Sequence, residues 1–485
     1  MKTRTLPSIM ALLAPFAAAL SQVPDRSQPP AIGPPPEMKA PSVERLWLKN
    51  GLQIILVEKH DVPLVQINLQ VMAGSVLDTK GNFGLASMTA DLLDEGAGGR
   101  DALELADAID YLGANLSTRA GYHTSVISLN TPLRQLDAAL PLLADVALKP
   151  AFATADLDRK RDERLTAMIQ ARDEARSIAS VQFNKAIFGK GHPYGRSASG
   201  NAAGLKALTA KKIGKFYNKY YRPNNAALIV VGDITADEIM PQLERYFGSW
   251  KKKRVKTPKW TDVSQVRGRT IYLVDKPGAA QSEIRIGRVG VPRNTVDYYN
   301  LAVLNTILGG AFTSRLNQNL REEHGYSYGA RSSFNMRPHA GPFTASAAVQ
   351  TDVTDKALTE FMKELNGILE EVPAEELSKS QNYVALGYPA NFQTVARVAS
   401  QLQNLVLYNL PDETFSRYAE GIYEVTSRDL MEAAAKYIDT GNMAIIVVGD
   451  RQAVEEGIQA LNLGTIVYLT IEEVMGPVPT LGASK

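Results

Sequence analysis

Acidic side chains recur at close spacing in the stretch GLASMTADLLDEG, residues 84–96. If this stretch is helical, Asp91, Asp94 and Glu95 share one face, where carboxylates could bind a hard cation weakly. The alternative, which we favour, is an acidic patch held by salt bridges. The other face of the helix is apolar and is predicted to be core: Leu85, Met88 and Leu92.

The histidines and cysteines predict no other metal site. No two histidines lie about three to five residues apart, which is the spacing of a ligand pair on a helix or turn. Cysteine is absent, which excludes thiolate ligands and cysteine nucleophiles. The histidines are His60, His123, His192, His324 and His339. The sequence therefore predicts no metal site built on a histidine pair or on thiolates.

Two hydrogen-bond donors, Arg321 and Tyr328, lie seven positions apart in LREEHGYSY. A guanidinium and a phenol together could donate hydrogen bonds to a carbonyl oxygen and stabilise an oxyanion. Gly325 allows a helix to end between them in a left-handed turn, so that Tyr328 starts the next strand and faces the same cavity. The alternative is that Arg321 pairs with Glu322 or Glu323, while Tyr328 is a strand aromatic with its hydroxyl in water.

The composition is that of a globular protein with more than one domain. The chain has 485 residues, is 45% hydrophobic and carries 53 Lys+Arg against 51 Asp+Glu. Its net charge of +2 is too small to indicate nucleic acid or an anionic membrane as the main partner.

The N-terminal residues have the pattern of a secretory signal. Lys2 and Arg4 precede an apolar stretch from Leu6 to Leu20, and residues 1–21 are predicted to be a signal peptide. A membrane anchor is the alternative, but the stretch is shorter than the roughly 20 residues that span a bilayer. We therefore expect an exported, periplasmic location without stable membrane insertion. The proline-rich residues 22–43 are predicted to be a tether, with a strap across the folded body as the alternative.

Two pairs of segments repeat at a constant interval of 217 residues. ILVEK (55–59) matches YLVDK (272–276), and LIVVGD (228–233) matches IIVVGD (445–450). A strand at the start and another at the end of each half, in constant register, indicates internal duplication. Strands cluster in each half and helices follow them, which predicts an α+β fold with a mostly antiparallel sheet layered with helices.

The duplication divides the chain into two domains, at residues 44–250 and 268–470, followed by a tail at residues 471–485. The cationic segment between them, residues 251–267, is predicted to be a solvated linker about which the halves could hinge. The alternative is that this segment is a patch that binds nucleic acid, but such a patch is not expected in an exported protein.

Longer motifs make the chain similar to the pitrilysin-like (insulinase) metallopeptidases over about residues 44–460. The motifs are NGLQIILVEKH, GHPYGRSASGN, YYRPNNAALIVVGDI, GGAFTSRLNQNLREEHGYSYGARSSF and the repeated VVGD. The resemblance implies two halves of one fold, like those of LuxS and the mitochondrial processing peptidase, forming a clamshell around a peptide.

Active members of this family carry H-x-x-E-H on a helix of the first half. There two histidines one turn apart bind zinc, the glutamate activates water, and a distant glutamate completes the ligands. Laid over this sequence, the motif puts Ser87 and Asp91 at the histidine positions, Ala90 at the general base and Met168 near the distant glutamate. None of the four family residues is kept, so the resemblance implies that this chain binds no cofactor.

The resemblance also implies a partner: a subunit that carries H-x-x-E-H and the zinc, in a heterodimer or heterotetramer. The family spacing assigns Arg321 and Tyr328, rather than Tyr326, to the substrate carbonyl in the partner's site. We expect a subunit that is inactive alone and acts in peptide hydrolysis, with the peptide held as an added strand at a sheet edge. One alternative is a non-enzymatic peptide-binding or scaffold subunit. Another is an independent hydrolase using Ser197, whose surroundings GRSASG fall short of G-x-S-x-G.

Overall fold

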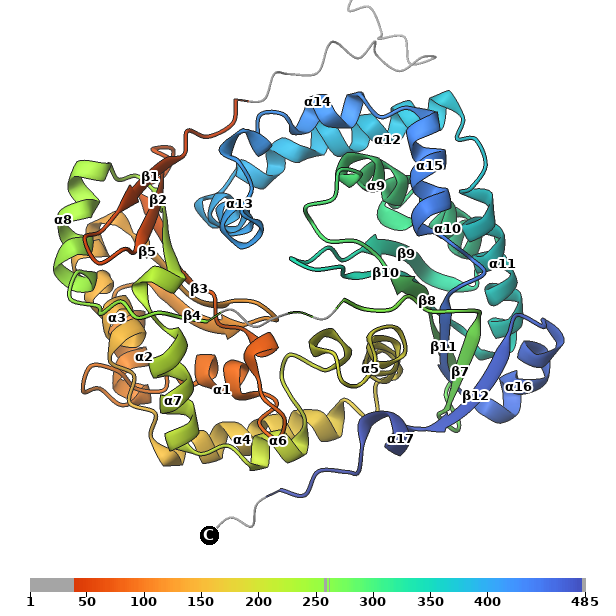
Figure 1. The fold of residues 1–485 in the computed structure, drawn as a ribbon, viewed down its shortest axis with the longest axis horizontal. Coiled ribbons are helices and arrows are strands. Elements are labelled where there is room, and N and C mark those ends of the chain that lie inside the picture. Colours follow the sequence, from red (N-terminus) through yellow and green to blue (C-terminus); the bar gives the residue numbers. More distant parts are fainter. Residues whose placement is uncertain (1–38, 257–259, 261, 482–485) are drawn as a thin grey trace, which may run out of the picture. The chain divides into compact units, whose positions relative to one another are not determined.

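The computed structural model describes residues 39–256, 260 and 262–481. The predicted signal peptide (1–21) and most of the predicted tether lie outside these ranges. The described residues form two sheets of six strands, one in each half, layered with helices (Figure 1). This confirms the predicted α+β fold of two like halves. No helix within the described ranges is long and apolar enough to cross a membrane.

The first sheet has the strand order β1-β2-β6-β3-β5-β4. All neighbours are antiparallel except β2 and β6, which are parallel. Its strands are β1 (Glu44–Trp47), β2 (Gln53–Glu58), β3 (Leu64–Val71), β4 (Asn115–Ala120), β5 (Ser125–Pro132) and β6 (Ala226–Gly232). The helices of this half are α1 (Leu85–Asp91), α2 (Ala102–Tyr111), α3 (Leu136–Leu148), α4 (Thr154–Gln170), α5 (Ala175–Phe188), α6 (Ala202–Lys206), α7 (Ala210–Tyr220) and α8 (Ala236–Phe247).

The second sheet has the order β12-β7-β11-β8-β10-β9, and both β11 and β12 run parallel to β7. Its strands are β7 (Thr270–Asp275), β8 (Gln281–Val289), β9 (Ser327–Phe334), β10 (Pro342–Gln350), β11 (Ala444–Gly449) and β12 (Thr465–Thr470). The helices of this half are α9 (Tyr298–Asn305), α10 (Arg315–Asn317), α11 (Thr354–Gly367), α12 (Ala374–Gly387), α13 (Val395–Tyr408), α14 (Tyr418–Tyr423), α15 (Ser427–Tyr437), α16 (Arg451–Ala460) and α17 (Ile471–Met475).

Shorter helical turns connect these elements. Two are π-helical, namely η5 (Thr306–Gly310) and η6 (Gln318–Glu323). The 3-10 turns are η1 (Ser75–Leu77), η2 (Leu133–Gln135), η3 (Pro193–Gly195), η4 (Pro223–Asn225), η7 (Thr351–Val353), η8 (Tyr388–Phe392) and η9 (Asp412–Thr414).

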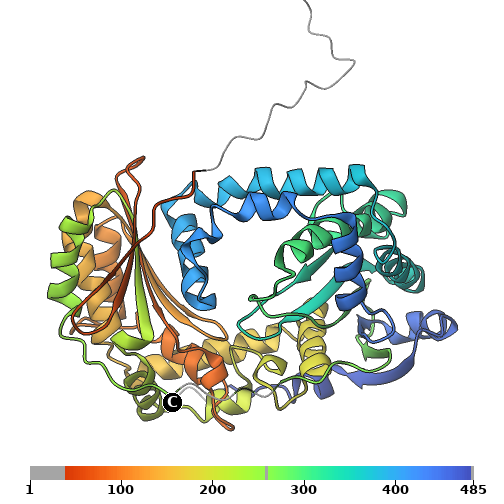
Figure 2. The same cartoon turned by 45° about the horizontal axis from the view of Figure 1, so that its top comes forward.

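The first VVGD strand, β6, is apolar along its length because both of its faces are buried. Leu228 and Val230 face the helices of their own half. Ile229 and Val231 pack against α13, which belongs to the second half. Figure 2 shows this helix in blue beside the first sheet.

The second VVGD strand, β11, repeats the arrangement. Ile445 and Val447 lie in the core of the second half, while Ile446 and Val448 pack against α5 of the first half. One helix of each half therefore packs on the sheet of the other half. This exchange joins the halves of the clamshell and explains why the duplicated strands have no polar face.

The connector between the halves is only partly solvated. Its lysines at residues 251–253 are exposed, as predicted for a linker, but Trp260 packs into the cluster around α5. Three histidine rings surround Trp260, with centroids 5.5 Å (His123), 5.7 Å (His192) and 4.2 Å (His339) from its own. These histidines are distant in sequence, so their spacing gave no sign of the cluster.

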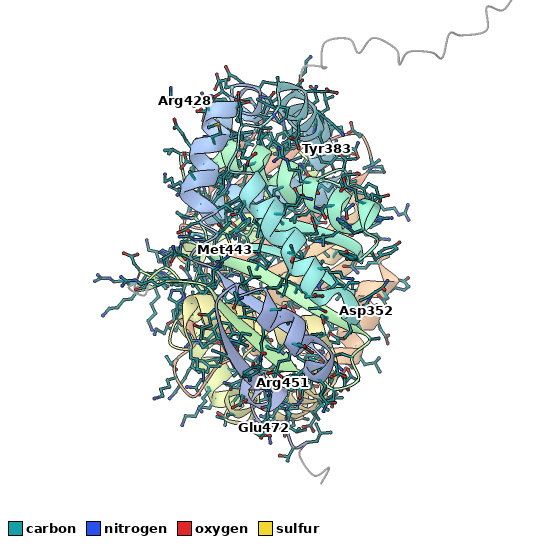
Figure 3. The ribbon with its side chains drawn as sticks, turned by 90° about the vertical axis from the view of Figure 1, so that its right-hand side faces the viewer. Asp352, Tyr383, Arg428, Met443, Arg451 and Glu472 are labelled. Carbon is teal, nitrogen blue, oxygen red and sulfur yellow. The ribbon has the colours of Figure 1, made fainter. Side chains whose placement is uncertain are left out.

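The predicted tail begins with a packed helix. Val474 of α17 is fully buried and lies in the cluster around α5. Glu472 on the same helix is exposed and lies at the lower end of the molecule in Figure 3. Residues 471–475 therefore belong to the folded body.

Candidate functional site

Helix α1, which corresponds to the zinc motif, begins at a glycine that closely approaches its neighbours. Gly84 has φ of 97°, and a Cβ there would lie 2.8 Å from the carbonyl oxygen of Ser199. The carboxylate of Asp78 accepts hydrogen bonds from the N–H groups of Gly84 (2.7 Å) and Ala86 (2.9 Å). Burial raises the pKa of Asp78 to about 6. These contacts hold the start of α1 in place.

Arg164 of α4 joins the two positions at which the family carries histidine. Its Nη1 donates to the hydroxyl of Ser87 at 2.7 Å, and its Nε donates to the carboxylate of Asp91 at 2.9 Å. A fixed guanidinium thus lies against both side chains, and its positive charge repels a metal cation. Arg164 was not predicted from the sequence, although it lies four residues before Met168 and so on the same face of α4.

The other two family positions are also unsuited to a metal or a base. Ala90 is fully buried, and Met168 is partly buried against the first core. Among the described residues, no group of three or more His, Asp or Glu side chains could hold a metal ion. The hydroxyl, methyl, carboxylate and thioether at these four positions do not fit a tetrahedral zinc site.

The prediction that Asp91, Asp94 and Glu95 share one helical face is wrong, because α1 ends at Asp91. Asp94 accepts a hydrogen bond from Thr118 at 3.1 Å, and burial raises its pKa to about 6. Glu95 pairs with Arg159 and with Lys160, the latter at 2.7 Å. The salt-bridge alternative therefore holds for Asp91 and Glu95, whereas Asp94 has a hydroxyl as its partner.

Ser197, the alternative nucleophile, has no catalytic partner in the described structure. Its hydroxyl pairs with the hydroxyl of Ser199 at 2.7 Å. No histidine of the described residues forms a hydrogen bond with it, so the geometry gives no support to an independent serine hydrolase.

Arg321 and Tyr328 lie together on the surface of the second half. Arg321 comes from η6, Gly325 turns the chain at φ of 67°, and Tyr328 is the second residue of β9. The guanidinium carbon lies 5.2 Å from the centre of the Tyr328 ring and 4.5 Å from that of Phe312. Tyr328 is 89% exposed and Phe312 is 60% exposed. The predicted pair is therefore adjacent, with Tyr328 exposed and Arg321 half-buried. The ring of Phe312 beside it was not predicted from the sequence.

Of the alternatives for this pair, the structure contains the surface ion pair of Arg321 but does not favour Tyr326 over Tyr328. Arg321 Nε lies 3.2 Å from the carboxylate of Glu322, as the surface-pair alternative predicted. Tyr326 stacks on His324 and packs against the second core, so it cannot replace Tyr328 at the surface. Within the described ranges no hydrogen bond engages the Tyr328 hydroxyl, which leaves this donor available to a ligand.

Buried residues of the same long motif position the pair. Asn317 accepts a hydrogen bond from the N–H of Ala330 at 3.1 Å and donates to the carbonyl of Phe312 at 2.7 Å. Gly309 lets η5 approach β9, because a Cβ there would lie 2.2 Å from the nitrogen of Ser332. The Phe312 loop and the Tyr328 strand are thereby tied to each other.

Comparison with known families divides the chain into two matches. Residues 53–200 match the family described as Insulinase (Peptidase family M16). Residues 207–384 match the family described as Peptidase M16 inactive domain. Together these matches span more than half of the chain.

Similar proteins and structures agree with these matches. A protein of Rickettsia bellii (strain RML369-C), named an uncharacterized zinc protease, is 23% identical over 405 residues, which is 82% of this chain and 96% of the relative. A crystal structure of a peptidase M16 inactive domain from Pseudomonas fluorescens has a TM-score of 0.79 and 24% identity, covering 84% of this chain and 98% of its own. The first half of the periplasmic protease PqqL from Escherichia coli has a TM-score of 0.70 and 15% identity, covering 88% and 98%. The whole PqqL chain is covered to 52%.

Proposed function

Since the chain belongs to the pitrilysin-like (M16) metallopeptidase family, we propose that it is the subunit without zinc in an exported two-subunit peptidase. Its partner is a chain of the same family that carries H-x-x-E-H and the zinc ion. This chain contributes Arg321 and Tyr328 to the shared site, and a peptide is the substrate.

The observation that carries the proposal is the contrast between the two halves. In the first half, Arg164 joins Ser87 and Asp91 where a metal would have to bind. In the second half, Arg321 and Tyr328 remain adjacent, and Tyr328 is exposed. A chain that lacks the metal but keeps the donors for substrate is suited to a site completed by another chain.

The part of this chain in the reaction is to bind and polarise a carbonyl group. Arg321 and the Tyr328 hydroxyl are donors that strengthen their hydrogen bonds as the carbonyl oxygen gains negative charge. Zinc held by the partner would supply the activated water. The exposed rings of Phe312 and Tyr328 give the same surface an apolar character that suits burial against a partner.

Two further observations support the pairing and the location. The PqqL chain is about twice as long as the part that this chain matches, which suggests that a unit of this fold acts with further protein. PqqL is described as periplasmic, and residues 1–21 of this chain have the pattern of a secretory signal.

The test is peptide cleavage by the complex that co-purifies with the tagged chain. We expect Arg321→Ala and Tyr328→Phe to lower kcat/KM by about 100-fold and about tenfold respectively, because each removes a donor to the oxyanion. Arg331→Ala, at an exposed position of the same strand, is the matched control and should leave turnover unchanged. Equal turnover of all three variants and the parent would refute the role of the pair.

A scaffold role is the second candidate, and the ion pair between Arg321 and Glu322 favours it. A side chain already paired at the surface need not contact substrate. In that case no zinc-containing chain would co-purify, and Arg321→Ala would change no activity.

A further inference from the structure

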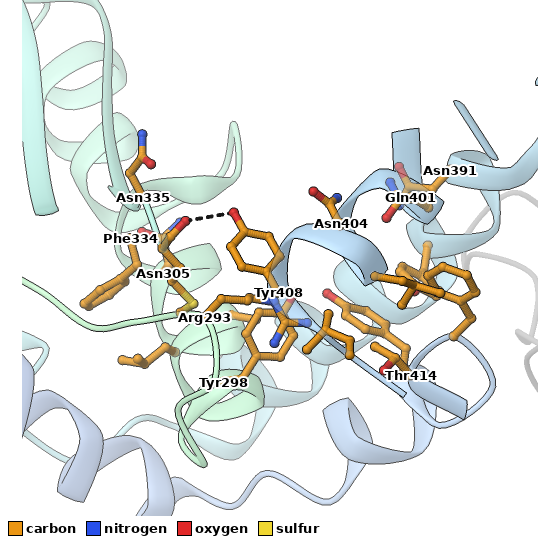
Figure 4. A pocket seen from close by; sticks show the side chains of 18 residues that line it. Arg293, Tyr298, Asn305, Phe334, Asn335, Asn391, Gln401, Asn404, Tyr408 and Thr414 are labelled. Carbon is orange, nitrogen blue, oxygen red and sulfur yellow. Dashed lines mark hydrogen bonds between the residues drawn. The ribbon is translucent and has the colours of Figure 1, made fainter. Parts of the chain in front are cut away.

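A polar cavity of about 470 Å³ lies in the second half, between α9, α13, α14 and η8 (Figure 4). Its volume is within the range of small-ligand pockets. Four tyrosines line it, one from each of these elements: Tyr298, Tyr388, Tyr408 and Tyr418. Burial raises the pKa of Tyr388, Tyr408 and Tyr418, so these hydroxyls stay neutral. Tyr408 donates to the carbonyl of Met336 at 3.2 Å.

The cavity has one charged lining residue, Arg293. Its guanidinium lies over the ring of Tyr298, 3.4 Å from the ring centre. No carboxylate of the described residues forms a salt bridge with it, and the lining contains no acid. A partly buried guanidinium that lacks a carboxylate gains most from an anionic ligand, because it donates two parallel hydrogen bonds to a carboxylate.

Five carboxamides supply most of the remaining polarity, and one of them, Asn305, accepts a hydrogen bond from the Ser332 hydroxyl at 2.9 Å. The other four come from three segments. Asn335 follows β9, Asn391 lies in η8, and Gln401 and Asn404 lie on α13 (Figure 4). None of the four side chains forms a hydrogen bond with another part of the described chain. Each offers one acceptor and two donors, which complement the C=O and N–H of a peptide group.

We propose that this cavity binds the C-terminal end of a peptide, with the free carboxylate at Arg293 and the last peptide groups at the carboxamides. The choice of a peptide over other carboxylates rests on the proposed function. The carboxylate itself is inferred from the lining alone.

Helix α13 would connect this cavity to the junction of the halves. Its Gln401, Asn404 and Tyr408 line the cavity, whereas Val398 and Leu402 pack on the first sheet. A peptide bound to α13 would therefore stabilise the element that joins the second half to the first.

The test is isothermal titration of the purified chain alone with N-acetyl-trialanine as the free acid, the same peptide as the C-terminal amide, and D-glucuronate. We expect the acid to bind at least about tenfold more tightly than the amide, since a charged hydrogen-bonded pair is lost on amidation. Arg293→Gln should remove this preference. Asn404→Asp, at an exposed position of a helix, should weaken binding of the acid more than binding of the amide, because its negative charge repels only the free carboxylate. This variant keeps the test valid if Arg293→Gln misfolds. Arg428→Gln, whose side chain is 86% exposed, is the control and should bind like the parent.

Equal affinity for acid and amide would overturn the assignment, as would no binding of either peptide at millimolar concentration. Tighter binding of D-glucuronate than of the peptide acid would overturn it in favour of a saccharide. No partner or zinc is present in this titration, so its failure leaves the role of Arg321 and Tyr328 intact. Conversely, unchanged turnover in the Arg321 and Tyr328 variants would leave the peptide titration standing.

Discussion

Replacing Arg164 by methionine should destabilise the protein, because the guanidinium joins α4 to both ends of the degenerate zinc motif. It donates hydrogen bonds to Asp91 and Ser87 at 2.9 Å and 2.7 Å. Hydrogen bonds to charged groups contribute about 1.5–3 kcal/mol net. The Asp91 side chain is 30% exposed, however, so solvent screens part of the ion pair. We expect Arg164→Met to lower the free energy of unfolding by about 2–3 kcal/mol.

Urea unfolding followed by far-UV circular dichroism measures this change. A double-mutant cycle with Asp91→Asn should give a coupling energy of about 1–2 kcal/mol. Arg428→Met is the matched control, since its pair with Glu432 lies at the surface, and it should change stability by less than about 0.5 kcal/mol. A coupling energy of zero, or an unfolding midpoint equal to that of the parent, would refute the view that Arg164 holds the metal-free site together.

Three other changes test the packing of the halves and the positioning of the Arg321 and Tyr328 pair. Burial lowers the pKa of His123 to about 3. In the unfolded chain this histidine titrates near 6.5, so the unfolded state takes up the proton first as the pH falls. The free energy of unfolding should therefore fall below about pH 6.5, by about 2 kcal/mol at pH 5. His123→Gln should reduce this loss of stability, measured by urea titrations. Burial raises the pKa of Asp78 and Asp94 to about 6, so these groups change stability in the opposite direction between about pH 6 and 4, but their effect cancels in the comparison with the parent. An unaltered pH dependence in His123→Gln would contradict this assignment. Phe183→Ala empties space between α5 and the second sheet and should cost about 3–5 kcal/mol of unfolding free energy; a loss below about 1 kcal/mol would mean that α5 does not join the halves. Asn317→Ala should speed amide hydrogen exchange at Ala330, whose N–H loses its acceptor, and an equal exchange rate would contradict the positioning role of Asn317.

The sequence predicted the fold through its repeated apolar strands. LIVVGD and IIVVGD have no polar alternation, and the structure shows why: each is covered on one face by its own half and on the other by α5 or α13. The packing of α5 and α13 on the sheet of the opposite half could not be predicted, because hydrophobic periodicity and composition do not show which face of a strand a distant helix covers. The packed part of the connector was missed for the same reason, since Trp260 packs against His123, His192 and His339, which are far from it in sequence.

Within the candidate site, the sequence predicted only that Arg321 and Tyr328 lie close together, because one short motif contains both. Arg321, Gly325 and Tyr328 lie within eight residues, and the turn at Gly325 brings the two side chains together as expected. Arg164 and Phe312 were missed because their roles depend on tertiary contacts. The acidic face failed because α1 ends at Asp91, where the expected helix would have continued.

Zinc content tests the central claim most directly. The chain is purified alone and in complex with whatever co-purifies from its own source, and metal is measured by mass spectrometry after extensive dialysis. The account predicts negligible zinc in the isolated chain and about one zinc ion per complex, bound to the H-x-x-E-H subunit. About one tightly held zinc ion per isolated chain would contradict it.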